Sequence, residues 1–132
     1  MAKAIKAKLL SFDMKDRPGL LSEVTTALAG AKVNITAICA YAWDDTAYFD
    51  MTTGSNAKAK KALSALKLKV DEEDVIAVEM ANRVGELQKV AKGLVEGGIN
   101  ITYMYATTST GRTSTAIFST SDNSKALRLI NK

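Results

Sequence analysis

The sequence contains no histidine, one cysteine, one proline and few aromatic residues. Without histidine, the chain lacks the side chain that serves most often as general acid, general base or metal ligand. The single Cys39 excludes an intramolecular disulfide and a zinc site built on several thiolates. No GxxxxGK[ST], GxGxxG or GxSxG string occurs either. We therefore predict no catalytic residue, no metal site and no cofactor.

Long apolar runs are also missing. The first ten residues, MAKAIKAKLL, contain no apolar stretch of the kind found in secretory signal peptides. No segment approaches the 18 or more consecutive apolar residues of a membrane-spanning helix. Together with the low cysteine content, this predicts a cytoplasmic protein that does not contact a membrane.

The charge of the chain is mildly positive, at +4. Its lysines cluster near the N-terminus and between Lys58 and Lys69, a pattern that nucleic acids or membrane surfaces could attract. We favour the simpler interpretation, in which these lysines form the solvated faces of amphipathic elements. The acidic run Asp71–Asp74 is likewise interpreted as a solvated turn rather than a metal site.

The chain contains an internal duplication. The segment RPGLLSEVTTALAGAKVNITAICA (17–40) aligns without gaps on RVGELQKVAKGLVEGGINITYMYA (83–106), and nine of the 24 aligned positions are identical. Further on, TAYF (46–49) matches TAIF (115–118) after a hairpin that is three residues longer in the second copy. We therefore predict two copies of one structural unit.

Each copy predicts a strand, a helix, two strands and a second helix, in that order. The first helix of the second copy is apolar at Leu87, Val90, Ala91, Leu94 and Val95, which is the spacing of a helix that lies on a core. The remaining elements are expected at Leu9–Met14, Val33–Trp43, Thr46–Thr53, helix Ala57–Leu66 and a closing strand near Leu66–Val70, and then at Val75–Met80, Ile99–Thr108, Arg112–Thr120 and helix Asn123–Ile130.

This order is the βαββαβ pattern of an α+β fold. We predict two tandem ferredoxin-like repeats, residues 1–72 and 73–132, each an antiparallel sheet with both helices on one face. The second repeat is expected to lack its last strand, because the offset between the copies places that strand beyond Lys132. We expect the vacant edge to be filled by the residues before Leu9 or by another chain, so a homodimer is predicted.

The motif that carries functional information is Asp16-Arg17-Pro18-Gly19-Leu20-Leu21, followed by Asn34-Ile35. This strand, D-R-P-G-x-L turn, helix and Asn-Ile strand resembles the ACT domain family of regulatory ligand-binding modules. The second copy carries Asn82-Arg83-Val84-Gly85 and Asn100-Ile101 at the same spacing. The arrangement is similar to proteins that consist of two tandem ACT domains alone.

The resemblance implies a regulatory module that binds an amino acid between paired domains and has no catalytic activity. The residue types suit that ligand: a glycine turn brings the backbone close to it, a helix N-terminus attracts a carboxylate, and an asparagine both donates and accepts. The first loop is expected to be the better site, since the second replaces Asp16 and Pro18. The predicted binding residues are Asp16, Arg17, Pro18, Gly19, Leu20, Asn34, Ile35, Asn82, Arg83, Gly85, Asn100 and Ile101.

Two alternatives remain open from the sequence. The chain could be an assembly module without a ligand, for example the partner of a metabolic enzyme. RNA-recognition domains share the βαββαβ order, but their third strand carries a K/R-G-F/Y-G/A-F-V-x-F/Y pattern. The strands TAYFDMTT and TSTAIFST lack that pattern and its basic residue. Nucleic acid is therefore not the expected partner.

Overall fold

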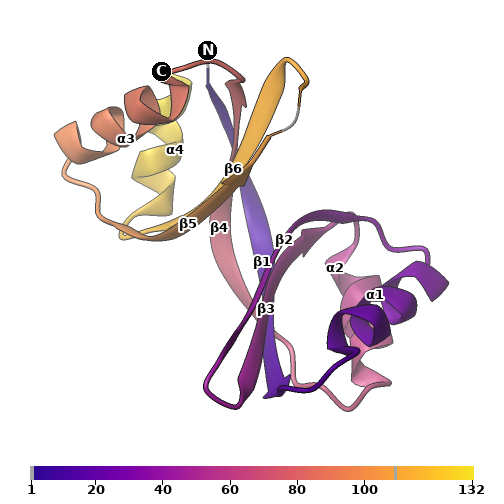
Figure 1. The fold of residues 1–132 in the computed structure, drawn as a ribbon. Helices are drawn as coiled ribbons and strands as arrows, with labels where there is room; N and C mark the ends of the chain where they lie inside the picture. The colour runs from indigo at the N-terminus through magenta and orange to yellow at the C-terminus, as the bar shows by residue number, and fades with distance from the viewer. Residues whose placement is uncertain (1, 109) are drawn as a thin grey trace. The chain divides into compact units, whose positions relative to one another are not determined.

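The chain folds into two compact units, each with its own core (Figure 1). The computed structural model describes residues 2–108 and 110–132. The first unit consists of residues 8–73, and the second unit consists of residues 74–132 together with residues 2–7. The predicted division between residues 72 and 73 differs by one residue from the observed one, but the residues before Lys8 belong with the second unit instead of the first.

The first unit is a sheet covered on one face by two helices. Its elements are β1 (Lys3–Lys15), α1 (Leu20–Gly30), β2 (Ile35–Trp43), β3 (Thr46–Thr53), α2 (Asn56–Ser64) and the start of β4 (Asp71–Ala81). The strand order is β2-β3-β1-β4, and β3 pairs antiparallel with both of its neighbours. Helices α1 and α2 pack on the same face of this sheet (Figure 1).

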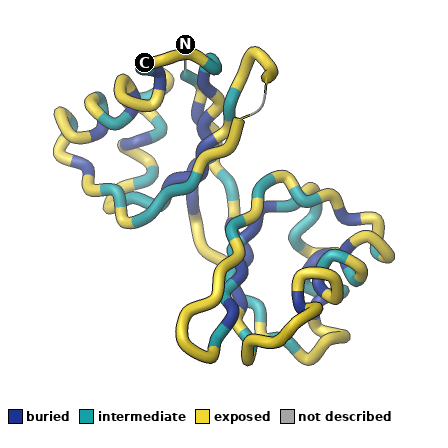
Figure 2. Tube along the Cα trace, in the orientation of Figure 1, coloured by how far each residue is buried: buried dark blue, intermediate teal, exposed yellow. Residues whose placement is uncertain are grey.

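The core of the first unit follows from the periods of strand and helix. Along β3, Phe49 and Met51 are buried toward the helices, while Tyr48 and Asp50, which alternate with them, belong to the opposite face. Along α1, the buried residues Leu20, Val24 and Leu28 recur every four residues and form a single stripe. Figure 2 shows buried and exposed positions mixed along the chain in both units. Each large apolar side chain buried in this way stabilises the unit by about 1.5–3 kcal/mol.

The second unit repeats this architecture. It contains the rest of β4, α3 (Glu86–Glu96), β5 (Ile101–Thr107), β6 (Thr113–Thr120) and α4 (Asn123–Asn131). β6 pairs antiparallel with both β4 and β5, and both helices cover one face. The fold class predicted from the sequence is thus confirmed.

The edge beside β4 in the second unit is filled by the first residues of β1. Ala4 is buried in the second core, and its backbone pairs with the side chain of Asn131 at the end of α4. The Ala4 N–H donates to Asn131 Oδ1 at 2.7 Å, and Asn131 Nδ2 donates to the Ala4 carbonyl at 2.8 Å. The segment before Leu9 is therefore the strand that completes the second repeat.

Two local predictions were wrong. The closing strand expected at Leu66–Val70 does not form: α2 ends at Ser64, and Lys67 turns the chain with a φ of +62°. Leu68 and Val70 then pack against the first core without pairing in a ladder. The strand starts instead at Asp71, so the acidic run Asp71–Asp74 is the exposed first part of β4 and not a turn.

Candidate functional site

The loop between β1 and α1 contains four of the predicted site residues, Asp16 to Gly19, and a fifth, Leu20, is the first residue of α1. Gly19 precedes the helix with a φ of +93°, a left-handed conformation that costs other residues about 1–2 kcal/mol. The first N–H groups of a helix have no partner within the helix, and no side chain caps the start of α1. Asp16 and Pro18 are exposed, whereas Leu20 is buried in the core and serves the fold.

Arg17 is already paired with Glu23 of the helix that follows it. Its guanidinium donates two hydrogen bonds to the carboxylate of Glu23, one of them from Nη2 to Oε1 at 2.9 Å. The hydrogen bond and the charge of Glu23 raise the pKa of Arg17, and the hydrogen bond from Arg17 lowers the pKa of Glu23. A ligand carboxylate at this loop would have to share the guanidinium with Glu23.

The loop between β4 and α3 has the same backbone. Gly85 precedes α3 with a φ of +90°, and this helix also starts without a side-chain cap. The Asn82 N–H donates to the Arg112 carbonyl at 2.8 Å, and its Nδ2 donates to the Gly111 carbonyl at 2.9 Å. Asn82 thus ties the loop to the β5–β6 hairpin, while the Arg83 side chain remains largely exposed.

Asn34 and Asn100 stand directly before β2 and β5. The Asn34 carbonyl accepts from the Gly54 N–H at 2.8 Å, and the Asn100 carbonyl accepts from the Ser121 N–H at 2.9 Å. Both residues are exposed, so their backbones are fixed while their side chains reach solvent. The residues that follow, Ile35 and Ile101, pack against the cores of their units.

Within a unit, the loop and the asparagine lie at opposite ends of the sheet. Lys15 at the end of β1 pairs with Thr46, whereas Ile35 at the start of β2 pairs with Thr53 on the same strand. That stretch of β3 spans about 23 Å at roughly 3.3 Å per residue. The second unit repeats this geometry among β4, β6 and β5. Neither unit alone brings the two halves of the predicted site together.

A cavity of about 210 Å³ lies beside the second loop, at the ends of β4 and β5. It is smaller than the roughly 300–1,000 Å³ of pockets for drug-sized ligands, so it suits a small molecule. The lining combines polar groups with apolar surface. It includes Asn82, Arg83, Glu86, Leu87, Ala106 and Thr107.

Glu86 is the residue of this cavity that the sequence analysis missed. It aligns with Leu20 of the first copy, and only 8% of its surface is exposed. The Lys89 ammonium donates to its Oε2 at 3.0 Å, and the Arg83 guanidinium lies 3.6 Å from the same oxygen. The hydrogen bond from Lys89 holds the pKa of Glu86 below its usual value. A charged residue at an aligned core position was the available clue.

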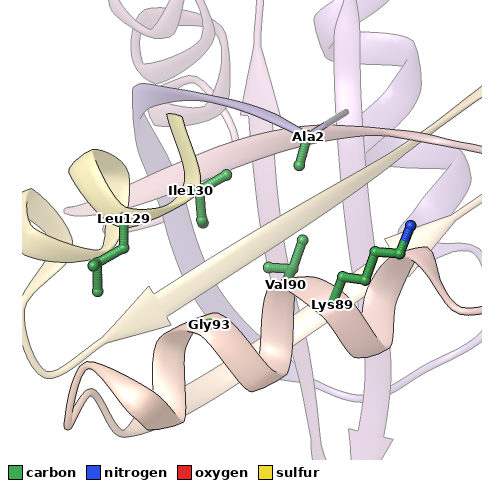
Figure 3. Close-up of a pocket in the computed structure, with 6 residues that line it drawn as sticks. All are labelled: Ala2, Lys89, Val90, Gly93, Leu129 and Ile130. Carbon is green, nitrogen blue, oxygen red and sulfur yellow. The ribbon is translucent and has the colours of Figure 1, made fainter. Parts of the chain in front are cut away.

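A second hollow of about 200 Å³ lies between α3, α4 and the start of the chain at Ala2 (Figure 3). Its lining is apolar, with Ala2, Val90, Leu129 and Ile130, except for the side chain of Lys89. Lys89 thus connects this hollow with the carboxylate of Glu86.

The chemistry of the other reactive groups does not indicate an active site. Burial, and then the nearby Asp50, raise the pKa of Cys39, so its thiol is protonated at neutral pH and is a poor nucleophile. Within residues 2–108 and 110–132, no group of three or more histidine, cysteine, aspartate or glutamate residues could hold a metal ion. None of the described helices is long and apolar enough to cross a membrane.

Comparison with known proteins gives one family match. Residues 8–67 match the family model of the ACT domain, and this segment lies within the first unit. A comparison with curated proteins finds no match.

Solved structures resemble the chain along nearly its whole length. Protein BT0572 from Bacteroides thetaiotaomicron is similar with a TM-score of 0.87 and 29% identity, covering 96% of this chain and 87% of that one. The ligand-free regulatory subunit of aspartate kinase from Thermus thermophilus gives a TM-score of 0.71 at 15% identity, covering 98% and 93%. A structure of aspartokinase α and β subunits gives 0.68 at 21%, covering 97% and 93%. At such low identity, the aspartokinase structures show a shared fold.

Proposed function

We propose that the protein is a regulatory module that binds a free amino acid, on the premise that residues 8–67 match the family model of the ACT domain. The observation that carries the proposal is the cavity that Asn82, Arg83 and Glu86 line beside the second loop, whose helix α3 starts without a side-chain cap. A helix N-terminus and a guanidinium both favour a carboxylate. No catalytic step is part of this proposal.

The predicted site has two halves, the glycine loop and the asparagine, and their separation within one unit suits a ligand bound between paired domains. The loop and the asparagine of one unit lie about 23 Å apart along the strands. A ligand at a loop therefore reaches an asparagine such as Asn34 or Asn100 only from another unit or another copy of the chain. We propose on this basis that the working form is a homodimer in the cytoplasm, which acts on a metabolic enzyme through ligand-dependent assembly.

The test is a thermal-shift screen of the protein against the twenty amino acids. A ligand that binds only the folded state at about 100 times its Kd adds roughly 2.7 kcal/mol of stability, which raises the Tm by several degrees. The variant Arg83→Ala should reduce the shift, while Arg128→Ala removes the same charge from an exposed position of α4 and should leave it unchanged. If no amino acid raises the Tm, the proposal is wrong.

A second candidate function, assembly without a ligand, is favoured by one observation. The side chains of Tyr41 and Trp43 are 53% and 74% exposed on β2, which is the edge strand of the first unit. Exposed aromatic residues beside an open edge suit a protein partner. An RNA-binding function is not favoured, because Phe49 and Phe118 of β3 and β6 are buried toward the helices and are not displayed for stacking on bases.

A further inference from the structure

The face of the first sheet that α1 and α2 leave uncovered carries three aromatic residues. Tyr41 of β2 pairs with Tyr48 of β3, and their rings stack with centroids 5.2 Å apart. Trp43 pairs with Thr46, two positions further along the same face. The helices pack on the other face of the sheet, and Tyr41 and Trp43 are exposed (Figure 1). Because tyrosine and tryptophan are enriched in protein interfaces, these rings suit a docking surface.

Carboxylates lie beside these rings. Asp13 of β1 pairs with Tyr48, and Asp50 stands two positions from Tyr48 on β3. Asp13 is exposed, whereas Asp50 is partly buried, and this burial raises the pKa of Asp50. Among the described residues, no lysine or arginine forms an ion pair with either carboxylate. The aromatic face is defined here as Asp13, Tyr41, Trp43, Tyr48 and Asp50.

The charges around the aromatic face favour a cationic partner. Lys15 lies at the end of β1 on this face, but the turn between β2 and β3 adds the exposed Asp44 and Asp45 beside Trp43. Negative groups thus outnumber positive ones here, although the whole chain has a formal charge of +4. An ammonium group interacts favourably both with a carboxylate and with the face of an aromatic ring. Lysine side chains are therefore the contacts that this face suits best.

A matching surface lies on α2 of the same unit. The core-facing residues of α2 are buried, and its outer side carries the exposed Lys58 and Lys61. Two more exposed lysines, Lys67 and Lys69, follow the helix in the sequence. Among the described residues, none of these four forms an ion pair, whereas Lys60 does. We call these four residues the lysine surface.

We propose that the aromatic face of one copy of the chain docks on the lysine surface of a second copy. The two surfaces belong to opposite sides of the first unit, because α2 covers one face of the sheet and the rings belong to the other (Figure 1). A contact between two different surfaces is head-to-tail and leaves one of each free, so further copies add in a row. This inference goes beyond the proposed function and needs no amino acid.

Sedimentation velocity of the full chain over a range of concentrations tests this assembly. At about 0.1 M salt, we expect the average mass to rise with concentration past that of a dimer, as copies add in a row. At about 1 M salt the Debye length falls from roughly 10 to 3 Å, and association should weaken about 10-fold or more. A mass that stays constant over the whole range, or that stops at a dimer, overturns the proposal.

Two double variants identify the surfaces. Asp13→Asn with Trp43→Ala removes an exposed charge and an exposed ring from the aromatic face. Lys58→Gln with Lys61→Gln neutralises the helical part of the lysine surface. Neither variant should form rows alone. Their equimolar mixture should gain mass and stop after one such contact, because each variant supplies the surface that the other lacks.

The control is Lys92→Gln with Lys125→Gln, which removes two exposed lysines from helices of the second unit and should assemble like the wild type. If this control weakens assembly as much as the change on α2, net charge and not the lysine surface drives it, and the proposal is wrong. A mixture that stays at the mass of its components overturns it as well. Each of these results leaves the proposed function intact, since the thermal-shift screen tests amino-acid binding separately.

Discussion

At the scale of single residues, the glycine before each first helix is required for its backbone and not for lack of space. Nothing lies within 4 Å of the position that a Cβ would take at Gly19, so only the left-handed φ opposes a side chain there. The last residue of α1, Gly30, also has open space around it, but its φ lies outside the left-handed region. We therefore predict that alanine has opposite effects on stability at Gly19 and at Gly30.

We expect Gly19→Ala to destabilise the first unit by about 1–2 kcal/mol, because alanine is strained in the left-handed conformation. Gly30→Ala should instead stabilise it by about 0.5–1 kcal/mol, because alanine favours the helix and restricts the unfolded chain. Urea unfolding, followed by the fluorescence of Trp43, measures both values. Equal effects of the same sign would show that the φ of Gly19 does not limit this position.

Single residues also show how far the site could be predicted. The glycine turns followed from the sequence, because a strand-to-helix turn with glycine at a fixed place occurs in both copies. The position of Asn34 relative to Gly19 did not follow, since the distance between them depends on strand register. Glu86 was missed because its neighbours Leu87, Val90 and Leu94 already accounted for the helix, and charge at a helix start is common.

At the scale of secondary structure elements, the last helix and the first strand depend on each other. The Asn131 side chain satisfies both backbone groups of Ala4, as a neighbouring strand would do. Helix α4 is also fixed at its start, because the Asp122 carboxylate accepts from the Lys125 N–H at 3.0 Å. The helix is thus anchored at both ends, and one of its anchors is the β1 segment.

Replacing Asn131 by alanine should release the start of β1. Loss of two partly buried hydrogen bonds predicts a destabilisation of about 1–3 kcal/mol and faster amide exchange over residues 3–7. Hydrogen exchange followed by mass spectrometry measures this directly. Arg128→Ala, an exposed change on the same helix, is the control, and similar exchange in both variants would contradict the role of Asn131.

The order of the helices and strands could be predicted from the sequence, but the first and last residues of some of them could not. The alternation of leucine or valine with lysine in Leu66–Val70 has the period of a strand, and the helical period of α2 ends close to it. The structure uses the same apolar residues differently, because Lys67 turns the chain and Leu68 and Val70 cover the first core from its edge. Apolar period alone does not tell a strand from a packed loop of this length.

At the scale of the whole molecule, the boundaries of the two compact units do not coincide with those of the two sequence repeats. β1 and β4 each begin in one unit and end in the other. The duplication predicted the fold of both copies correctly, because each copy contains apolar residues at the spacing of helices and of strands. It left two candidates for the vacant edge of the second sheet, the residues before Leu9 or another chain, and the structure places residues 2–7 there.

Deleting residues 2–7 should therefore destabilise the second unit, to which these residues belong, more than the first unit, which follows them directly in the sequence. The second unit loses the buried Ala4 and both bonds to Asn131, which predicts a loss of about 2 kcal/mol or more. Amide exchange should increase in β4 and α4, while the fluorescence of Trp43 should report an unchanged first unit. The double variant Lys3→Ala, Lys6→Ala keeps the strand and controls for the lost charge, and equal weakening of both units would contradict the assignment.

The bond between Ala4 and Asn131 joins residues that are 127 positions apart in the chain. During synthesis, the strand that closes the second unit leaves the ribosome before the rest of both units, whereas its partner helix α4 follows every other element of them. The first unit has all of its residues, up to Glu73, while the second still lacks most of its own. The two hydrogen bonds between Asn131 and Ala4 can therefore form in the nascent chain only after α4 has appeared.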